Sequence, residues 1–351
     1  MDVSDLLGRE LASVDVEAIT RFFRDKKVLI TGGGGSIGSE LARVLCRCKC
    51  PEIILVDFSE NNLYEVQMDL QLISPQQKMS AYLTDVCDAP ELEKIFEKHR
   101  PDIVFHAAAH KQVPVVETHF LQGVRNNVLG TKTTVDLALK YKAEYFTLIS
   151  TDKAIHPKSV MGTSKRVSEL YLQSLTSPAT RLFTVRFGNV FNSRGSVVPL
   201  FRKQIAETRS VTITDPEATR YFMDCTEAVF LILQTVLIGR DSEIFILDMG
   251  KPVKIVDLAH NLAQLMGVSP QELSIRYTGL RPGEKLAELI QLEEEVAQET
   301  LNPKIKIWKT SNKPASGFQK ELNKLIELVS GSSTREEVVA QLKKIVPEYK
   351  P

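Results

Sequence analysis

A glycine-rich turn near the N-terminus constrains the fold of this chain more than any other feature. Residues 31–38 (TGGGGSIG) follow a short β-branched strand at 26–31 and precede an amphipathic helical pattern. Glycines let the backbone turn sharply and approach a pyrophosphate without Cβ obstruction, so that the next helix directs its N–H groups at the anion. The turn therefore predicts a βαβ unit that binds a dinucleotide. We expect five of its residues to contact the cofactor: Gly32, Gly35, Ser36, Ile37 and Gly38.

An acidic residue at the end of the second predicted strand indicates which dinucleotide is bound. Asp57 ends the apolar run 53–57 and lies 19 positions after Gly38 (57 − 38). Its carboxylate is placed to accept hydrogen bonds from the adenosine ribose, and residues 58–62 (FSENN) contain no Lys or Arg to neutralise a 2′-phosphate. The alternative, a glycine turn followed by a surface aspartate, leaves this combination of strand, turn, helix and spacing unexplained. We therefore expect NAD rather than NADP.

Strand and helix patterns alternate from residue 26 to residue 187. Short apolar runs predict strands at 26–31, 53–57, 80–83, 103–107, 145–149 and 182–186, and helical patterns lie between them at 37–45, 63–72, 89–99, 124–141 and 165–175. This rhythm predicts a Rossmann-type α/β fold, with a doubly wound parallel sheet and helices on both faces.

The remaining segments predict a smaller, discontinuous substrate domain. We expect an NAD-binding domain at 26–187, rejoined by 226–250, and a substrate-binding domain formed by 188–225 and 251–302. Residues 1–25 read as a leader with a short helix. Residues 303–351 read as a linker, at 303–317, followed by amphipathic helices, of which the last has capping-box spacing at Ser333 and Glu336.

Composition argues against several other functional classes. The 351 residues carry 44 Lys and Arg against 44 Asp and Glu, and this balance gives no support to binding nucleic acid or a membrane surface. No basic segment precedes an apolar one at the N-terminus, and the longest apolar run, 228–238, is shorter than the roughly 20 residues a membrane helix needs. We expect a soluble, cytoplasmic protein without membrane insertion.

The five cysteines do not have the spacing of a metal site. Three of them form a Cys-x-Cys-x-Cys cluster at 46–50, which lacks both the usual Cys-x2-Cys spacing and a fourth ligand. We interpret them as reduced thiols and expect no metal.

Two further strand ends give weaker cofactor predictions. Asp85 and Val86 follow the third strand, where they can reach the adenine, and Ala107, Ala108 and Ala109 end the fourth, where small side chains leave room for the cofactor. Three alanines can equally serve close packing between a helix and a strand.

Polar residues at the end of the fifth strand are candidates for catalysis. The run 150–153 (STDK) supplies Thr151, Asp152 and Lys153, and Lys165 follows twelve residues later. Strand ends of such sheets face the ligand crevice, which favours a catalytic role. The alternative is that Asp152 and Lys153 form a solvated ion pair.

At this point the chain resembles the extended short-chain dehydrogenases, and among them the nucleotide-sugar 4,6-dehydratases of bacterial polysaccharide and glycan biosynthesis. The resemblance runs from about Asp5 to Leu289. It is carried by motifs at 5–9 (DLLGR), 106–114 (HAAAHKQVP), 127–131 (NVLGT), 150–154 (STDKA), 186–190 (RFGNV) and 281–285 (RPGEK). The first motif is of the kind found just ahead of the soluble part of long members that begin with membrane helices, so we expect this chain to match their catalytic portion.

One position departs from the pattern of the wider superfamily, which uses Tyr-x-x-x-Lys. Met161 stands in place of the tyrosine, four residues before Lys165. A thioether cannot exchange the proton of a sugar hydroxyl at neutral pH. One branch of these dehydratases also carries methionine there, so the resemblance implies an active enzyme in which another group, such as a water held near Met161, moves that proton.

The resemblance implies a reaction in three stages. The sugar is oxidised at C4, water is eliminated across C5 and C6, and hydride returns to C6 to give a 4-keto-6-deoxy sugar. Lys165 is expected to hold the nicotinamide ribose and Asn127 to contact the cofactor. Thr151 is expected to hydrogen-bond the C4 oxygen. Lys153 is the expected base at C5, provided that its pKa is depressed, and Asp152 the expected acid at the C6 hydroxyl.

Later motifs are expected to bind the substrate. By resemblance, Lys111, Asn189, Arg220, Arg281 and Glu284 line the sugar-nucleotide pocket, and Arg194 is a further cationic fork suited to a diphosphate. Single arginines are more often surface charges, which is the alternative for each.

These observations lead to one main hypothesis and two alternatives. The main one is NAD-dependent 4,6-dehydration of a UDP-linked N-acetylhexosamine, with UDP-N-acetylglucosamine as the expected substrate, by a homo-oligomer. A sugar-nucleotide 4-epimerase shares the fold and NAD but releases no water. A non-catalytic NAD-binding regulator is suggested by the missing tyrosine. The nucleotide base and the stereochemistry at C5 stay open, with retention favoured by family analogy.

Overall fold

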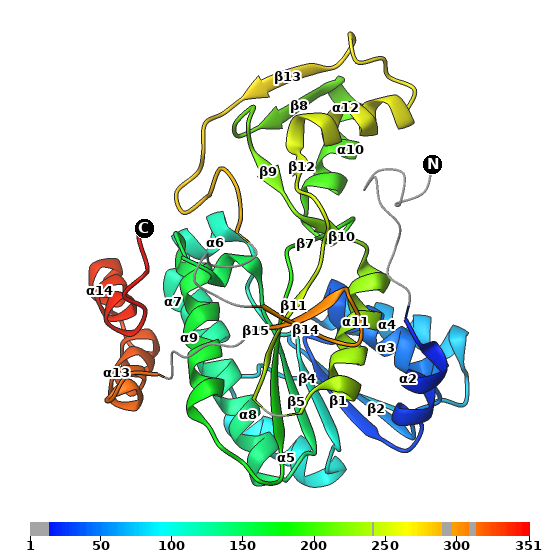
Figure 1. Ribbon diagram of the computed structural model, residues 1–351, viewed down its shortest axis with the longest axis vertical. Coiled ribbons are helices and arrows are strands. Elements are labelled where there is room, and N and C mark those ends of the chain that lie inside the picture. The colour runs from blue at the N-terminus through cyan, green and yellow to red at the C-terminus, as the bar shows by residue number, and fades with distance from the viewer. Residues whose placement is uncertain (1–13, 241, 290–296, 309–313) are drawn as a thin grey trace.

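A nine-stranded sheet forms the centre of the protein in a computed structural model that describes residues 14–240, 242–289, 297–308 and 314–351 (Figure 1). Its strand order is β14-β15-β11-β6-β5-β4-β1-β2-β3. The strands from β11 to β3 are mutually parallel. In chain order these are β1 (Lys27–Thr31), β2 (Glu52–Asp57), β3 (Met79–Leu83), β4 (Ile103–His106), β5 (Tyr145–Ile149), β6 (Arg181–Arg186) and β11 (Ile244–Leu247). The predicted Rossmann-type α/β fold is confirmed.

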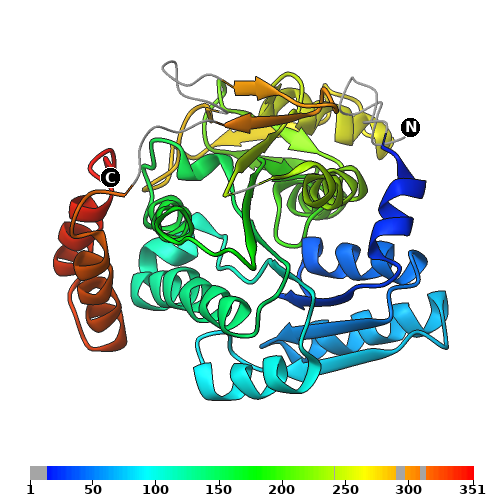
Figure 2. The same ribbon diagram turned by 60° about the horizontal axis from the view of Figure 1, so that its bottom comes forward.

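Helices cover both faces of this sheet because alternate residues of each parallel strand are apolar on opposite sides. In β1, Val28 and Ile30 enter one core and Leu29 the other. The first core is closed by α2 (Val16–Phe23), α3 (Ser36–Arg47), α4 (Glu60–Ile73) and α11 (Cys225–Ile238). The second is closed by α5 (Ala89–His99), α8 (Gly130–Lys140) and α9 (Val160–Ser174). Figure 2 shows the two layers of helices on either side of the strands.

Short helical segments follow two of the strands whose ends face the cleft. After β4 come α6 (Val113–Thr118), α7 (Phe120–Val124) and a π-helical turn, η1 (Arg125–Leu129), which leads directly into α8. After β5 a single 3₁₀ turn, η2 (Asp152–Ala154), carries the chain toward α9. The predicted helix at 124–141 is thus a π-turn continued by an α-helix.

A smaller lobe stands over the carboxyl edge of the sheet (Figure 1). Its own apolar core includes Val198, Phe201, Leu258 and Leu262. It contains β7 (Asn189–Val190), α10 (Val197–Thr208), β8 (Ser210–Ile213), β9 (Thr219–Arg220), β10 (Phe222–Met223), β12 (Val253–Lys254), α12 (Ile255–Leu265) and β13 (Ser274–Tyr277). Between two parts of this lobe the chain returns to the main sheet as α11 and β11, so the lobes are threaded through each other.

The C-terminal region differs from the sequence-based expectation in two places. Part of the predicted linker is β15 (Ile305–Trp308), which pairs antiparallel with β11 and, on its other side, with β14 (Ala297–Glu299). The hairpin of α13 (Phe318–Ser330) and α14 (Arg335–Ile345) packs on the α9 side of the sheet. The predicted capping box was wrong by one residue. Thr334 is the cap, because its hydroxyl accepts from the Glu337 amide and the Glu337 carboxylate accepts from the Thr334 amide.

The leader is only partly described. The short helix expected there is α2, whereas the 5–9 motif lies outside the described residues. Within the part of the chain that the structure describes, no helix combines the length and apolar character needed to cross a bilayer.

Candidate active site

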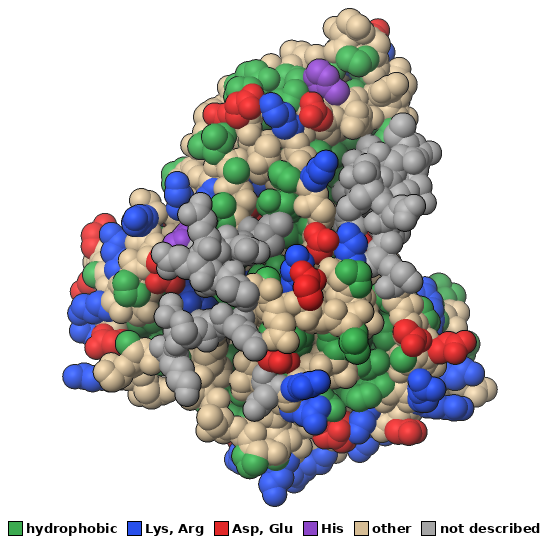
Figure 3. Space-filling view, in the orientation of Figure 1, with side chains coloured by type: hydrophobic (Ala, Val, Ile, Leu, Met, Phe, Trp, Pro, Cys, Tyr) green, Lys and Arg blue, Asp and Glu red, His purple; other side chains and the backbone are tan. Residues whose placement is uncertain are grey.

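A cleft of about 540 Å³ lies where the carboxyl ends of the parallel strands meet the smaller lobe. Figure 3 shows the two lobes in space-filling form. The sheet domain contributes the start of α3, the loops after β4 and β5, and the start of α9. The smaller lobe contributes β7, Arg220 of β9, and the 193–197 loop. Because residues far apart in the sequence line one cavity, this is the site in which the predicted groups can act together.

Close backbone packing explains the glycines of the first turn. Gly32 has φ +65°, and a Cβ there would lie 2.6 Å from the amide nitrogen of Ala108. A Cβ on Gly38 would lie 2.1 Å from the carbonyl oxygen of Gly32. Gly35 caps α3 without a side chain, and Ser36 and Ile37 line the cleft beside it. The first turn of α3 thus presents its backbone N–H groups to the cavity, as an anion site requires.

Asp57 is buried beside the turn and holds it in place. One carboxylate oxygen accepts from the Gly34 amide at 2.8 Å and the other from the Ser59 amide at 2.9 Å. Next to it Phe58 is 67% exposed and meets His110 edge to face at a centroid distance of 5.9 Å. Asp57 itself does not line the cavity.

The weaker cofactor predictions fall into two groups. Ala107 and Ala109 line the cleft, whereas Ala108 packs against Gly32. Asp85 accepts from the Cys87 amide at 2.8 Å and pairs with Arg125 at 3.0 Å. Burial alone would raise the pKa of Asp85, but these two donors lower it overall. Val86 is buried under Gly130.

Asn127 does not line the cleft. Its Oδ1 accepts from the His110 amide at 2.8 Å, and its Nδ2 donates to the His110 carbonyl at 3.1 Å and to the Ser164 hydroxyl at 2.9 Å. This fully buried amide therefore ties the loop after β4 to α9. It positions the cleft wall instead of standing in it.

Helix α9 carries Met161 and Lys165 one turn apart on the cleft side. Among the described residues, none accepts a hydrogen bond from Lys165 Nζ, although this atom is buried. Burial lowers the pKa of Lys165 from 10.5 to about 8, and the charge of Glu169 opposes this only in part. A buried cation without a partner is costly, so this position favours a ligand that accepts hydrogen bonds.

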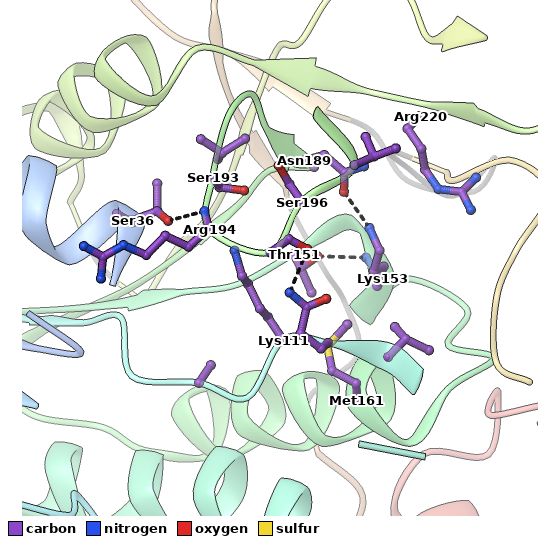
Figure 4. Close-up of a pocket in the computed structure, with 18 of the residues that line it drawn as sticks. Ser36, Lys111, Thr151, Lys153, Met161, Asn189, Ser193, Arg194, Ser196 and Arg220 are labelled. Atoms are coloured by element: carbon purple, nitrogen blue, oxygen red, sulfur yellow. Dashed lines mark hydrogen bonds between the residues drawn. The ribbon is translucent and has the colours of Figure 1, made fainter. Parts of the chain in front are cut away.

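The residues after β5 form a buried charge cluster, of which Figure 4 shows Thr151, Lys153 and their neighbour Asn189. Lys153 Nζ donates to Asn189 Oδ1 and to Asp152 Oδ1, each at 3.1 Å, and lies 3.5 Å from Glu288 Oε1. Thr151 Oγ1 donates to the same Asp152 oxygen at 2.9 Å. Thr151, Lys153 and Asn189 line the cleft, whereas Asp152 is buried behind them.

The cluster corrects two expectations for this pair. The role of Lys153 as a base was expected only if its pKa were depressed, and that condition is not met. Burial lowers this pKa, but Asp152 and Glu288 outweigh burial and raise it. Burial raises the pKa of Asp152, and Lys153 opposes that rise. Since Asp152 does not reach the cavity, it can exchange protons with a substrate only through Thr151 or Lys153.

The cationic residues predicted to bind a diphosphate do not all point the same way. Arg220 lines the cleft, where it donates to Glu284 at 2.9 Å. Arg281 also lines it, and its amide donates to the second oxygen of Glu284 at 3.2 Å. Lys111 lines it as well, and burial lowers its pKa.

Arg194 is turned away from this group. Its guanidinium donates to the Gly34 carbonyl at 3.1 Å and contacts Asn62 and Glu65 of α4, while its amide donates to Ser36 Oγ at 3.1 Å. In Figure 4 its side chain points away from Lys153 and Arg220. In this structure Arg194 closes over the glycine turn rather than joining the other arginines.

Three residues of this region were missed from the sequence. Glu288 and Lys285 are buried beside Lys153, and Lys285 Nζ also donates to the Ile155 carbonyl at 2.9 Å. Glu117 accepts from the Val160 amide at 2.7 Å, at the start of α9, and pairs with Arg335 of the C-terminal hairpin. The i, i+3 spacing of Lys285 and Glu288 was a usable signal, but nothing local marks Glu117.

The fold and this cleft match those expected from the resemblance to the extended short-chain dehydrogenases. A family model described as "Polysaccharide biosynthesis protein" matches residues 28–310. The chain belongs to that family.

Curated relatives agree with this assignment. The chain is 42% identical over 308 residues to the capsular polysaccharide biosynthesis protein CapD of Staphylococcus aureus, and 43% identical over 309 residues to the probable polysaccharide biosynthesis protein EpsC of Bacillus subtilis. Each match covers 87% of this chain but 51% of the relative, so the chain spans about half the length of these proteins. A UDP-glucose 4-epimerase of Rickettsia canadensis is 35% identical over 79% of this chain and 80% of its own length.

Solved structures show the same fold. Pen from Bacillus thuringiensis superposes with a TM-score of 0.76 at 30% identity, covering 83% of this chain and 90% of that one. DesIV, a dTDP-glucose 4,6-dehydratase from Streptomyces venezuelae solved with NAD and TYD, gives a TM-score of 0.67 over 76% of this chain and 88% of that one. At 20% identity the second likeness concerns the fold alone.

Proposed function

We propose that this chain uses NAD to dehydrate a UDP-linked N-acetylhexosamine across C5 and C6, with UDP-N-acetylglucosamine as substrate. The observation that carries the proposal is the buried Asp152–Lys153 pair beside Thr151, at the wall of the same cleft as Lys165. An epimerase needs proton exchange only at C4. A dehydratase needs a second exchange at C5 and C6, and this pair can supply it.

The residues present fit NAD. The glycine turn adjoins the cavity, and a Cβ on Gly32 or Gly38 would crowd backbone atoms there. Asp57 holds the turn in place. Lys165 Nζ has no acceptor among the described residues, so it is free to donate to acceptors such as ribose hydroxyls. When bound, the nicotinamide supplies a reversible hydride acceptor for the oxidation at C4 and the reduction at C6.

Thr151 replaces the missing phenol in our proposal. Its hydroxyl lines the cleft and already donates to Asp152 Oδ1 at 2.9 Å. The proton of the C4 hydroxyl passes to Thr151 Oγ1 as the threonine proton moves on to Asp152. A carboxylate whose pKa is raised by burial is a better acceptor than an exposed one. Met161 fills the adjacent wall without taking part in proton transfer.

Lys153 then serves both carbons of the elimination. It is an ammonium at rest, so it gives one proton to the departing C6 hydroxyl, which leaves as water, and takes the proton from C5. When C6 is reduced, Lys153 returns a proton to C5. The proton stored on Asp152 crosses the 3.1 Å hydrogen bond to restore the ammonium, which balances the cycle.

Arg220, Arg281 and Lys111 would hold the diphosphate, since all three are cations of the cleft wall. Asn189 would orient Lys153, to which it is hydrogen-bonded.

Product mass tests the proposal. Purified protein is incubated with UDP-N-acetylglucosamine and NAD, and the products are separated and weighed by mass spectrometry. Loss of one water supports dehydration. An isomer of unchanged mass identifies a 4-epimerase, the second candidate, which the 35% identity to a protein named UDP-glucose 4-epimerase favours. No turnover of any nucleotide sugar, with NAD bound, identifies a binding protein.

A further inference from the structure

Glu288 is a buried acid that the reaction scheme above does not use. It lies just before the end of the described segment 242–289, where its side chain is 3% exposed. Its Oε1 is 3.5 Å from Lys153 Nζ and its Oε2 is 3.2 Å from Lys285 Nζ. A carboxylate in so dry a place is retained only if charged partners compensate its loss of hydration.

Two contacts connect Glu288 and its neighbours to the segment 151–155 after β5. Lys285 donates to the carbonyl of Ile155, two residues after Lys153, so residues 285–288 are fixed to that segment. A small pocket of about 130 Å³ adjoins the main cleft and is lined by both Lys153 and Glu288. Glu288 therefore lies beside the Lys153 ammonium at the wall of this small pocket.

We propose that Glu288 is a positioning residue that keeps Lys153 protonated and directed at Asp152 and Asn189. Its catalytic consequence rests on the proposed function, in which Lys153 must enter the cycle as an ammonium. Removing the negative charge of Glu288 leaves Lys153 with a single acidic neighbour, and the ammonium then loses its proton at lower pH.

The charges that face this group come from three parts of the chain. Asp152 and Lys153 lie at the end of β5, Arg220 in β9, and Lys285 and Glu288 in the segment after the 281–284 loop. Arg220 opposes protonation of Lys153, whereas Asp152 and Glu288 favour it. The pKa of Tyr221 is raised, mainly by burial and to a smaller extent by the nearby Asp152 carboxylate. Of the two acids that favour protonation, Glu288 is the one that does not belong to the segment after β5. It can therefore be substituted without changing the residues next to Lys153 in the chain.

The test compares Glu288→Gln with Glu288→Asp and with a control. Glutamine keeps the shape and removes the charge, whereas aspartate keeps the charge on a shorter stem. The control is Glu217→Gln, which removes an acid 65% exposed and paired with Lys254 at 3.0 Å on the surface. The proteins carry ¹³C,¹⁵N-labelled lysine, and Lys153→Arg identifies the Lys153 side-chain resonance. Thermal melting shows which variants fold.

The expected result is that the Lys153 titration moves to lower pH in Glu288→Gln by about one pH unit or more, as for loss of an opposite charge within about 4–6 Å. Glu288→Asp restores most of the difference, and Glu217→Gln leaves it unchanged. In turnover, the alkaline fall of kcat/KM moves with the titration. A folded Glu288→Gln protein in which Lys153 titrates as in the wild type overturns the inference.

Failure of the two proposals can be told apart. The NMR titration requires no turnover, so it tests the role of Glu288 even if the protein dehydrates no sugar. Conversely, loss of water from the substrate by the wild type supports the function whatever the titration shows. If Glu288→Gln does not fold, Lys285→Met is the second variant. It frees Glu288 from its other close cation, and a Lys153 titration that moves to higher pH supports the inference, whereas an unchanged one refutes it.

Discussion

Lys165→Met separates what the cleft needs for function from what the fold needs for stability. The ammonium of Lys165 is buried, and none of the described residues accepts a hydrogen bond from it. Its pKa falls from 10.5 to about 8, with burial as the main cause. At about 1.36 kcal/mol per pKa unit, holding this charge costs the folded protein about 3 kcal/mol near neutral pH. Methionine keeps the apolar stem and removes the charge, so the variant should be more stable by up to that amount.

The sign of the pH dependence follows from proton binding. Between about pH 8 and 10.5 the unfolded chain holds a proton on Lys165 that the folded protein has released. The stability of the wild type therefore rises with pH through this interval, and the advantage of Lys165→Met shrinks over the same range. Below about pH 8 the advantage is complete.

Urea unfolding at pH 7 and at pH 10, with and without NAD, measures both effects. Lys203→Met is the matched control, because that side chain is 71% exposed and its replacement should change stability by less than about 0.5 kcal/mol. Saturating NAD should stabilise the wild type, by about 2.7 kcal/mol at one hundred times its Kd, and the variant much less. A Lys165→Met protein that is less stable than the wild type at pH 7 without NAD would refute the reasoning.

Three further substitutions test other parts of the site. Gly38→Ala places a methyl group 2.1 Å from a carbonyl oxygen of the same turn, so NAD affinity measured by calorimetry should fall about fivefold or more, while Gly331→Ala, whose nearest neighbour would be 3.6 Å away, should not change it. Asp152→Asn removes the proposed proton acceptor behind Thr151, and kcat should fall by about 10²- to 10⁴-fold with NAD affinity intact; normal turnover would exclude this role. Arg335→Met removes the partner of Glu117 and should cost about 1–3 kcal/mol of stability, raising KM for the nucleotide sugar more than it lowers kcat. An unchanged KM would show that the C-terminal hairpin does not position the site.

The position of the glycine turn beside the cleft could be predicted because its signals are local. The glycine turn is bounded by a strand and a helix within a few residues, and the distance from Gly38 to Asp57 is the length of one βα unit. The signal for Lys165 is local in the same way, because this residue lies on the helix that follows the fifth strand. Local patterns of this kind fix both the element and the end of the sheet at which it lies.

The charge cluster could not be predicted because its partners are distant in sequence. Lys153 and Glu288 are 135 positions apart (288 − 153), and Glu117 and Arg335 are 218 apart (335 − 117). The direction of a pKa shift depends on such partners. The sequence therefore could not decide whether the pKa of Lys153 is depressed, as a base role would require, and the two acids raise it. The direction of Arg194 likewise depends on acceptors in α4 that nothing near it in the sequence indicates.

Strand β15 has a recognisable pattern in the sequence, but its neighbours obscure it. The run 305–308 (IKIW) alternates apolar and polar residues, as a half-buried antiparallel strand does, yet its neighbours rich in Pro, Asn, Ser and Lys favoured a linker. The position of the capping box was likewise ambiguous in the sequence, because Ser333 offers a hydroxyl equivalent to that of Thr334 one residue earlier.

Turnover of UDP-N-acetylglucosamine in deuterated water tests the central claim most directly. If Lys153 removes and returns the C5 proton while the C6 hydroxyl leaves as water, the product lacks one water and carries one deuterium, which NMR places at C5. The coupling constants of the same spectrum report the configuration there. A product of unchanged mass without deuterium, formed by protein that binds NAD, would contradict the account and identify an epimerase.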